Sequence, residues 1–163
     1  GIKKLPELDF DPDLSIYLNN FLRDAKSRGV LINDKLRKRL RTIKWVNQFT
    51  NPSASVNSLA MCNRYITSQH SVIGVKDLRW SAIEVLKERT LLYTEGSETL
   101  LKELMYHELF HCLMNKGHLP EQYFGIMSPH FAKGSKRAYK AWDALVDDMF
   151  SKFFIDIIPD VNF

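Results

Sequence analysis

Two histidines and a glutamate stand close together in the segment 107–111, which has the pattern H-E-x-x-H. On a helix, successive residues turn by about 100°, so His107 and His111 would lie one turn apart on one face. Imidazole nitrogens at that spacing can bind one metal ion at about 2.0–2.1 Å. Glu108 stands beside the first ligand, where it can accept a proton from water that the metal activates. The pattern predicts a zinc-dependent hydrolase; the alternative is an ordinary helix with structural histidines.

The residues around this segment predict the helix that would hold it. Ser97 and Thr99 are candidate N-caps, and Glu98 places an acid near the helix start. Between about 98 and 115 the chain has no Gly or Pro, and its apolar residues form a broad surface that would bury the site. They are Leu100, Leu101, Leu104, Met105, Leu109, Cys112 and Leu113. Gly117 is then the expected glycine stop.

His118 is the predicted third ligand. A zinc site for hydrolysis uses three protein ligands and keeps one position open. The glycine directly before His118 allows a sharp turn that brings this histidine back towards the metal. We therefore predict one catalytic Zn²⁺ on His107, His111 and His118. The remaining candidates for the third position are His130, Glu121, Asp143 and Asp147.

The stretch from about 98 to 129 resembles the metzincin zinc peptidases, whose pattern is H-E-x-x-H-x-x-G-x-x-H followed by a methionine turn. Gly-Ile-Met-Ser-Pro at 125–129 is similar to that turn, with Met127 as the Met-turn residue. One departure is clear. Six residues separate His111 from His118, where the family has five, and Met114 occupies the place of the family's glycine.

The resemblance implies a compact zincin/metzincin-like catalytic domain of the α+β class. It would contain N-terminal helices, a small twisted sheet, the zinc-binding active-site helix, the Met-turn and a C-terminal helix. It further implies a metalloendopeptidase in which zinc activates water and Glu108 is the general base. Tyr123 and His130 are candidates for contacts with the substrate or the oxyanion. By order along the chain, Thr90–Tyr93 would be the strand that pairs with an extended peptide substrate.

The rest of the chain predicts the following elements. Residues 1–13 are an extended arm, a first helix runs from about 14 to 25, and a second helix runs from Asp34, capped by Asn33, to about Phe49. A last helix covers about 135–154. The strand candidates are Leu59–Ile66, Val72–Val75, Ala82–Leu86 and Thr90–Tyr93.

Length and composition indicate the number of domains and the class of protein. A chain of 163 residues with 45% hydrophobic content predicts one domain over 1–163 with a real core. It has no run of eighteen apolar residues, so we expect no membrane span. Two cysteines make no disulfide framework: Cys112 is interpreted as a small buried thiol, and a bridge to Cys62 stays open. With no visible signal peptide, this leans towards a cytoplasmic location, although a processed end at Gly1 would hide a removed targeting segment.

A basic cluster offers a second function. Six cations crowd the predicted second helix: Lys35, Arg37, Lys38, Arg39, Arg41 and Lys44. They form either a solvated face or a contact with an acidic partner or nucleic acid, and the net charge of +4 is mild. The alternative to a peptidase is therefore a non-catalytic or DNA- or protein-binding protein on a zincin scaffold. SprT-like proteins, which carry the same pentapeptide and cut proteins on DNA, stand between the two.

Overall fold

The computed structural model describes residues 4–66, 78–120, 125–129 and 141–151. They form a mixed α and β structure with a four-stranded sheet, in the order β1-β2-β4-β3, and five helices. The strands are β1 (Asp9–Phe10), β2 (Leu40–Val46), β3 (Ala60–Ile66) and β4 (Leu78–Leu86). The helices are α1 (Pro12–Ser27), α2 (Asp34–Arg39), α3 (Lys87–Thr94), α4 (Glu98–Met114) and α6 (Trp142–Ser151).

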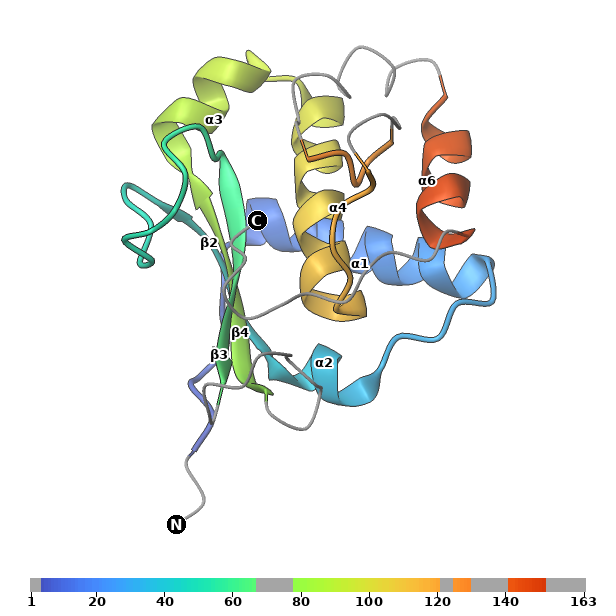
Figure 1. Ribbon diagram of the computed structural model, residues 1–163, viewed down its shortest axis with the longest axis horizontal. Helices are drawn as coiled ribbons and strands as arrows, with labels where there is room; N and C mark the ends of the chain where they lie inside the picture. The colour runs from blue at the N-terminus through green and yellow to red at the C-terminus, as the bar shows by residue number, and fades with distance from the viewer. Residues whose placement is uncertain (1–3, 67–77, 121–124, 130–140, 152–163) are drawn as a thin grey trace.

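The sheet is parallel except at one edge. β1 pairs with β2 and β2 with β4 in parallel, whereas β3 runs antiparallel to β4, with Cys62 opposite Ile83. β4 is buried along most of its length because it lies between two strands. α1, α4 and α6 lie on one side of this sheet, and α4 stands between the sheet and α6 (Figure 1). The structure therefore places α4 at the centre of the fold.

α4 is buried from all sides, from Glu103 to Leu113. Such burial suits a helix with apolar residues all round, which must be covered by other elements. β3 covers one face, and α1 and α6 cover another, where the Phe21 ring packs edge-on against Tyr106 at 5.3 Å and against Phe150 at 5.2 Å. The Tyr106 hydroxyl donates a hydrogen bond to Asp24. α4 is thus fixed between the sheet and the helical layer.

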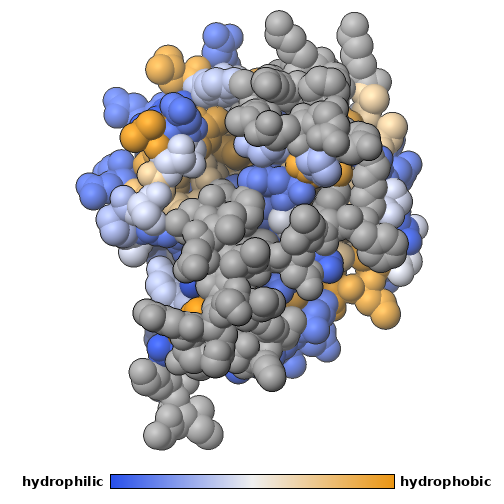
Figure 2. Space-filling view, viewed as in Figure 1, coloured by the Kyte–Doolittle hydropathy of each residue, from blue (hydrophilic) through white to orange (hydrophobic). Residues whose placement is uncertain are grey.

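Two predicted elements are wrong. The second helix ends at Arg39, and the chain continues as β2 instead of running helically to Phe49. The apolar residues of this stretch suit a helix or a strand. Residues 40–46 form a strand because they pair with β1 on one side and with β4 on the other. Thr90–Tyr93 lies in α3, not in a strand. Its apolar side chains face solvent, Leu92 being 80% exposed, and apolar surface is visible over α3 at the upper left of Figure 2.

Other expectations agree with the structure. The first helix, β3 and the helix predicted over about 98–115 are confirmed; Ala82–Leu86 is the second half of β4. The predicted arm contains β1. Of the last predicted helix, the described part is α6, whereas Val72–Val75 lies outside the described residues. None of the described helices is long and apolar enough to cross a membrane.

We predict that Phe21→Ala will lower the free energy of unfolding by about 3–5 kcal/mol, because it empties a fully buried aromatic site between α1, α4 and α6. Urea denaturation measures the change. Ile16→Ala on the same helix is the matched control, since Ile16 is 51% exposed and its truncation should cost less than about 0.5 kcal/mol. Equal effects of the two substitutions would contradict this description of the core.

Candidate metal centre

α4 begins and ends at identifiable residues. The Ser97 side chain is the N-cap and accepts a hydrogen bond from the Leu100 N–H at 3.3 Å, as the sequence predicts. At the other end Asn115, rather than the expected Gly117, adopts the left-handed conformation with φ 54°. Asparagine tolerates this conformation better than most residues. The chain therefore turns two residues earlier than predicted, directly after the last turn of α4.

Three imidazole rings converge at this end of the molecule. His107 and His111 lie one turn apart on α4, and His118 comes from the segment that follows the helix. The His107 Nε2 atom lies 3.0 Å from His118 Nε2 and 3.2 Å from His111 Nε2. The Nε2 atoms of His111 and His118 are also 3.2 Å apart. The predicted convergence of these three histidines is confirmed, despite the extra residue before His118.

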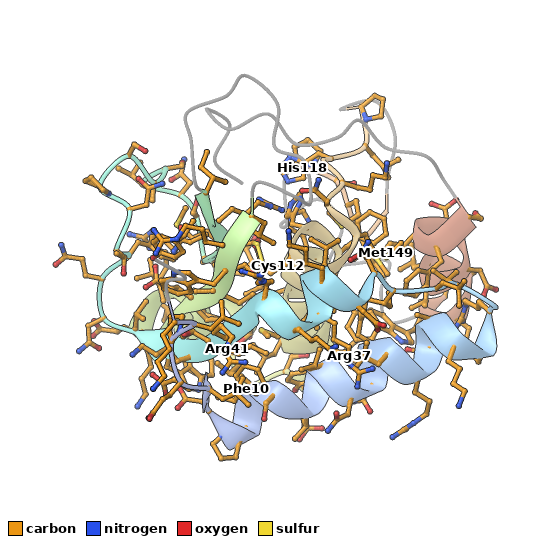
Figure 3. The ribbon with its side chains drawn as sticks, turned by 90° about the horizontal axis from the view of Figure 1, so that it is seen from below. Phe10, Arg37, Arg41, Cys112, His118 and Met149 are labelled. Atoms are coloured by element: carbon orange, nitrogen blue, oxygen red, sulfur yellow. A yellow bond between two sulfur atoms is a disulfide. The ribbon has the colours of Figure 1, made fainter. Side chains whose placement is uncertain are left out.

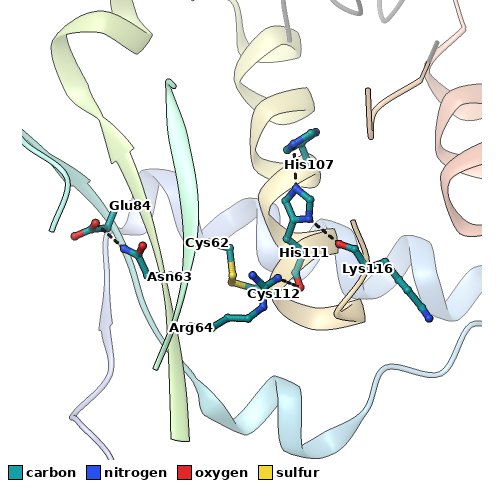
Figure 4. Close-up of a disulfide and its surroundings, with 8 residues drawn as sticks. All are labelled: Cys62, Asn63, Arg64, Glu84, His107, His111, Cys112 and Lys116. Atoms are coloured by element: carbon teal, nitrogen blue, oxygen red, sulfur yellow. Dashed lines mark hydrogen bonds between the residues drawn. A yellow bond between two sulfur atoms is a disulfide. The ribbon is translucent and has the colours of Figure 1, made fainter. Parts of the chain in front are cut away.

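Backbone carbonyl groups orient two of the rings. The His107 Nδ1–H donates to the Ile126 carbonyl at 2.7 Å, and the His111 Nδ1–H donates to the Lys116 carbonyl at 2.7 Å. A carbonyl oxygen can only accept, so the proton of each neutral ring resides on Nδ1 and Nε2 presents a lone pair. Metal-binding histidines commonly have such a partner behind the ring. Figure 4 shows the bond from His111 to Lys116.

The electrostatics keep these rings neutral. Burial lowers the pKa of His107 to about 4, because the imidazolium form loses its hydration, and the bond to Ile126 opposes this only in part. The pKa of His111 falls well below its usual value, mainly through burial and then through the neighbouring rings. Neutral rings are the form that binds a metal ion.

The three Nε2 atoms fit a tetrahedral cation. Two imidazole nitrogens at about 2.0–2.1 Å from one tetrahedral ion are about 3.3 Å apart, close to the separations given above. Lone pairs that face one another at 3.2 Å repel unless a cation or a proton lies between them. A buried group of His107, His111 and His118 can therefore hold a metal ion.

Glu108 directly follows His107 on α4 and is buried. Burial raises the pKa of its carboxyl group to about 8, while the nearby Arg64 and a hydrogen bond from the Cys62 backbone N–H act in the opposite direction. Its Oε2 atom has no hydrogen-bond partner among the described residues. Oε2 is therefore available to a ligand or to water.

β3 contributes two contacts to α4, one that the sequence analysis left open and one that it missed. Cys62 forms the disulfide with Cys112 on α4, with a Cα–Cα distance of 5.8 Å, so the interpretation of Cys112 as a buried thiol is wrong (Figure 4). Arg64, two residues further along β3, donates to the His111 carbonyl. Alternation along a strand places residues 62 and 64 on one face. With the disulfide, the cysteine count no longer supports a reducing compartment.

The turn at 125–129 packs under the loop that carries His118. The Leu119 N–H donates to the Met127 carbonyl at 2.8 Å, and the Ser128 N–H donates to the Gly125 carbonyl at 3.1 Å. A Cβ atom at Gly125 would lie 2.9 Å from Leu119 Cδ1, so this position requires glycine or a shift of Leu119. Met127 is fully buried. The turn supplies Ile126, whose carbonyl holds the His107 ring.

Two of the remaining predicted site residues, Asp143 and Asp147, are not part of this group. Asp143 and Asp147 are exposed on α6, and Asp147 pairs with Arg28 of α1. Three others lie outside the described residues: Glu121, Tyr123 and His130. Among the described residues only the three histidines form a potential metal-binding group.

The basic cluster does not lie on one helix, as the sequence analysis expected. Four of its cations are in α2, whereas Arg41 and Lys44 are in β2, and Figure 3 shows Arg37 and Arg41 well separated. Arg41 Nε donates to the Pro6 carbonyl at 2.7 Å, and Lys44 pairs with Asp9 at 3.1 Å. These two side chains stabilise the N-terminal strand, so the six cations are not one continuous face.

Comparison with known proteins adds no relative. No family model, curated protein or solved structure matches the chain. The chemistry of the site therefore rests on the geometry of its own residues.

The raised pKa of Glu108 predicts how metal-free protein responds to pH. A carboxyl group whose pKa rises on folding binds more protons in the folded state, so its contribution to stability falls as the pH rises from about 4.5 to about 8. Glu108→Gln should remove this loss. We expect the free energy of unfolding of the variant to rise relative to that of the parent by on the order of 1 kcal/mol for each pH unit in this window.

Urea unfolding of both metal-free proteins at several pH values measures the difference. Glu98→Gln, which removes an exposed acid at the start of the same helix, is the control for the loss of one carboxyl group. A difference for Glu108→Gln that stays constant from pH 4.5 to 8 would show that this carboxyl group is ionised normally.

Proposed function

We propose that this chain is a zinc-dependent metalloendopeptidase. One observation carries the proposal: the Nε2 atoms of His107, His111 and His118 converge within 3.0–3.2 Å, and the buried Glu108 directly follows His107 on α4. Nitrogen donors from three imidazoles are typical of a catalytic zinc site that keeps one position for water or substrate. A zinc ion there would act as a Lewis acid towards water and the substrate carbonyl group.

The protein's own residues account for the proton transfers. The Oε2 atom of Glu108 has no hydrogen-bond partner among the described residues, so it can accept the proton of the attacking water. The same oxygen then delivers this proton to the amine that leaves. The carbonyl groups of Ile126 and Lys116 hold the rings of His107 and His111, so that the ligands keep their orientation during the reaction.

A metzincin-like arrangement is part of this proposal. The supporting features are the antiparallel edge strand β3, the central helix α4 and the buried Met127 in a turn that contacts the His107 ring through Ile126. The resemblance implies that an extended substrate pairs with a sheet edge near the metal. Because Thr90–Tyr93 is helical, we assign this role to β3, which pairs only with β4 among the described strands.

A metal analysis is the first test. We expect about one zinc ion per chain, removable by a chelator with loss of peptidase activity. His118→Ala should weaken zinc binding by more than about 100-fold, since the loss of a group that merely supports a ligand already costs about 10–100-fold. Asp143→Ala is the control and should leave the affinity unchanged. A stable, active protein without metal would refute the proposal.

The general base is tested by substitution in the zinc-loaded protein. Glu108→Gln should keep the zinc and lower kcat by about 10²–10⁴-fold, because it removes the proton acceptor but not a ligand. His111→Ala should lose both zinc and activity. Cleavage of a casein-type or peptide substrate, measured beside the zinc content, distinguishes the two. Full activity of Glu108→Gln would show that another group accepts the proton.

A further inference from the structure

Of the two candidate metal ligands on α4, His111 lies closer to the end of the helix. α4 ends at Met114, and the next residue, Asn115, turns the chain in the left-handed conformation. Helix ends have carbonyl groups without an intrahelical partner, and they open more easily than helix centres. His107 lies one turn earlier, well inside α4. The orientation of the His111 ring therefore depends on what holds the last turn of the helix.

β3 holds this turn at two adjacent residues. Arg64 donates a hydrogen bond from Nη2 to the His111 carbonyl, and Cys62 forms the disulfide with Cys112. Residues 62 and 64 lie on one face of the strand, because side chains alternate along a strand. The His111 carbonyl also accepts a hydrogen bond from the Asn115 N–H at 3.1 Å. A side chain from the sheet and a covalent bond thus fix the backbone of one ligand and of its neighbour (Figure 4).

The hold on the His111 ring depends on the same turn. Its Nδ1–H donates to the carbonyl group of Lys116, which lies beyond the end of α4. A shift of residues 111–115 would move this carbonyl group away from the ring. The ring would then lose the partner that keeps its Nε2 atom directed at the other two imidazoles. Loss of such a partner commonly costs about 10–100-fold in metal affinity.

Asn63 lies between these two residues on β3 and makes a different contact. Its side chain donates to Glu84 of β4 at 2.7 Å, and both side chains are on the side of the sheet away from α4 (Figure 4). Asn63 is 8% exposed, so this hydrogen bond is buried. The same strand therefore has one buried contact that supports the sheet and two contacts that hold the helix.

We propose that Cys62, through its disulfide with Cys112, and Arg64 form an anchor that positions His111 and so sets how tightly the three histidines bind the metal ion. This inference rests on the metal centre of the proposed function. Cys62 and Arg64 are positioning residues, because neither belongs to the donor group and both act through the backbone of residues 111 and 112. Loss of the anchor should give a metal ion that is bound more weakly.

Zinc affinity, measured by competition with a chromophoric chelator, tests the anchor. Arg64→Met keeps a long side chain but removes its donors, and we expect zinc to bind about 10-fold more weakly. Removal of a positive charge would by itself favour a bound cation, so the sign of the change separates the lost contact from electrostatics. Arg64→Lys keeps a charged donor and should recover most of the loss. Cys62→Ala/Cys112→Ala should weaken zinc binding by about 10–100-fold.

Asn63→Ala is the matched control on the same strand. It removes the buried hydrogen bond to Glu84 and should lower the free energy of unfolding, as Arg64→Met and the disulfide-free variant do. It leaves both contacts between β3 and α4 in place. Its zinc affinity should therefore equal that of the parent.

Amide exchange in the metal-free protein gives a readout that depends on neither zinc nor activity. The Asn115 N–H donates to the His111 carbonyl and should be protected in the parent. Its exchange should accelerate in Arg64→Met and in the disulfide-free variant. This increase should exceed that at residues 104–108, well inside α4, because the opening is local. In Asn63→Ala the exchange at residue 115 should increase no more than at residues 104–108.

Three results would overturn the proposal. An unchanged zinc affinity in Arg64→Met and in the disulfide-free variant would make these contacts supports of the fold only. An equal loss of affinity in Asn63→Ala would show that any weakening of β3 is enough. Failure of both anchor variants to fold in the presence of zinc would make the anchor a requirement of the whole fold. A parent that binds zinc but cleaves no peptide would refute the proposed peptidase alone, because affinity and exchange carry this inference.

Discussion

Burial of the polar side chains of α4 is the constraint on which the rest of this structure depends. Three imidazole rings meet at their nitrogens, and two of them, with a carboxyl group, are buried inside the fold. A buried polar atom without a partner is costly, so each of these groups requires a donor or an acceptor from another segment. For the two buried rings, Ile126 and Lys116 supply the acceptors from the backbone. The turn at 125–129 and the end of α4 are where these acceptors lie.

The same constraint explains the partly buried charge on β3. Desolvation lowers the pKa of the Arg64 guanidinium group to about 10, while the charge of Glu108 opposes that change. A buried cation beside a buried acid costs less than either group alone. Its hydrogen bond to the His111 carbonyl also ties β3 to the last turns of α4. On the opposite side, Tyr106 and Asp24 tie the helix to α1, so α4 has little freedom to move.

Elements with strong local signals were predicted well, and elements that depend on pairing were not. The active-site helix was predicted from its N-cap at Ser97, and the structure begins it at the next residue. The stretch 40–46 has apolar residues that suit a helix as well as a strand, and pairing with β1 and β4 decides for the strand. At 90–93 the apolar residues look like a strand, but Thr90 bonds to the Leu59 carbonyl and the segment is helical. Such contacts between distant residues leave no local pattern.

For the candidate site, the sequence by itself determined the donor set. The spacing of His107 and His111 fixes two imidazoles on one helical face, and the proximity of His118 in the chain keeps the third within reach. The tertiary structure alone decided which carbonyl groups orient the rings, how Asn115 turns the chain, and that β3 brings Cys62 to Cys112 and Arg64 to the His111 carbonyl. The reason is physical: helical spacing is set by covalent geometry and local hydrogen bonds. The partner of a buried polar group is set by which distant segment packs against it.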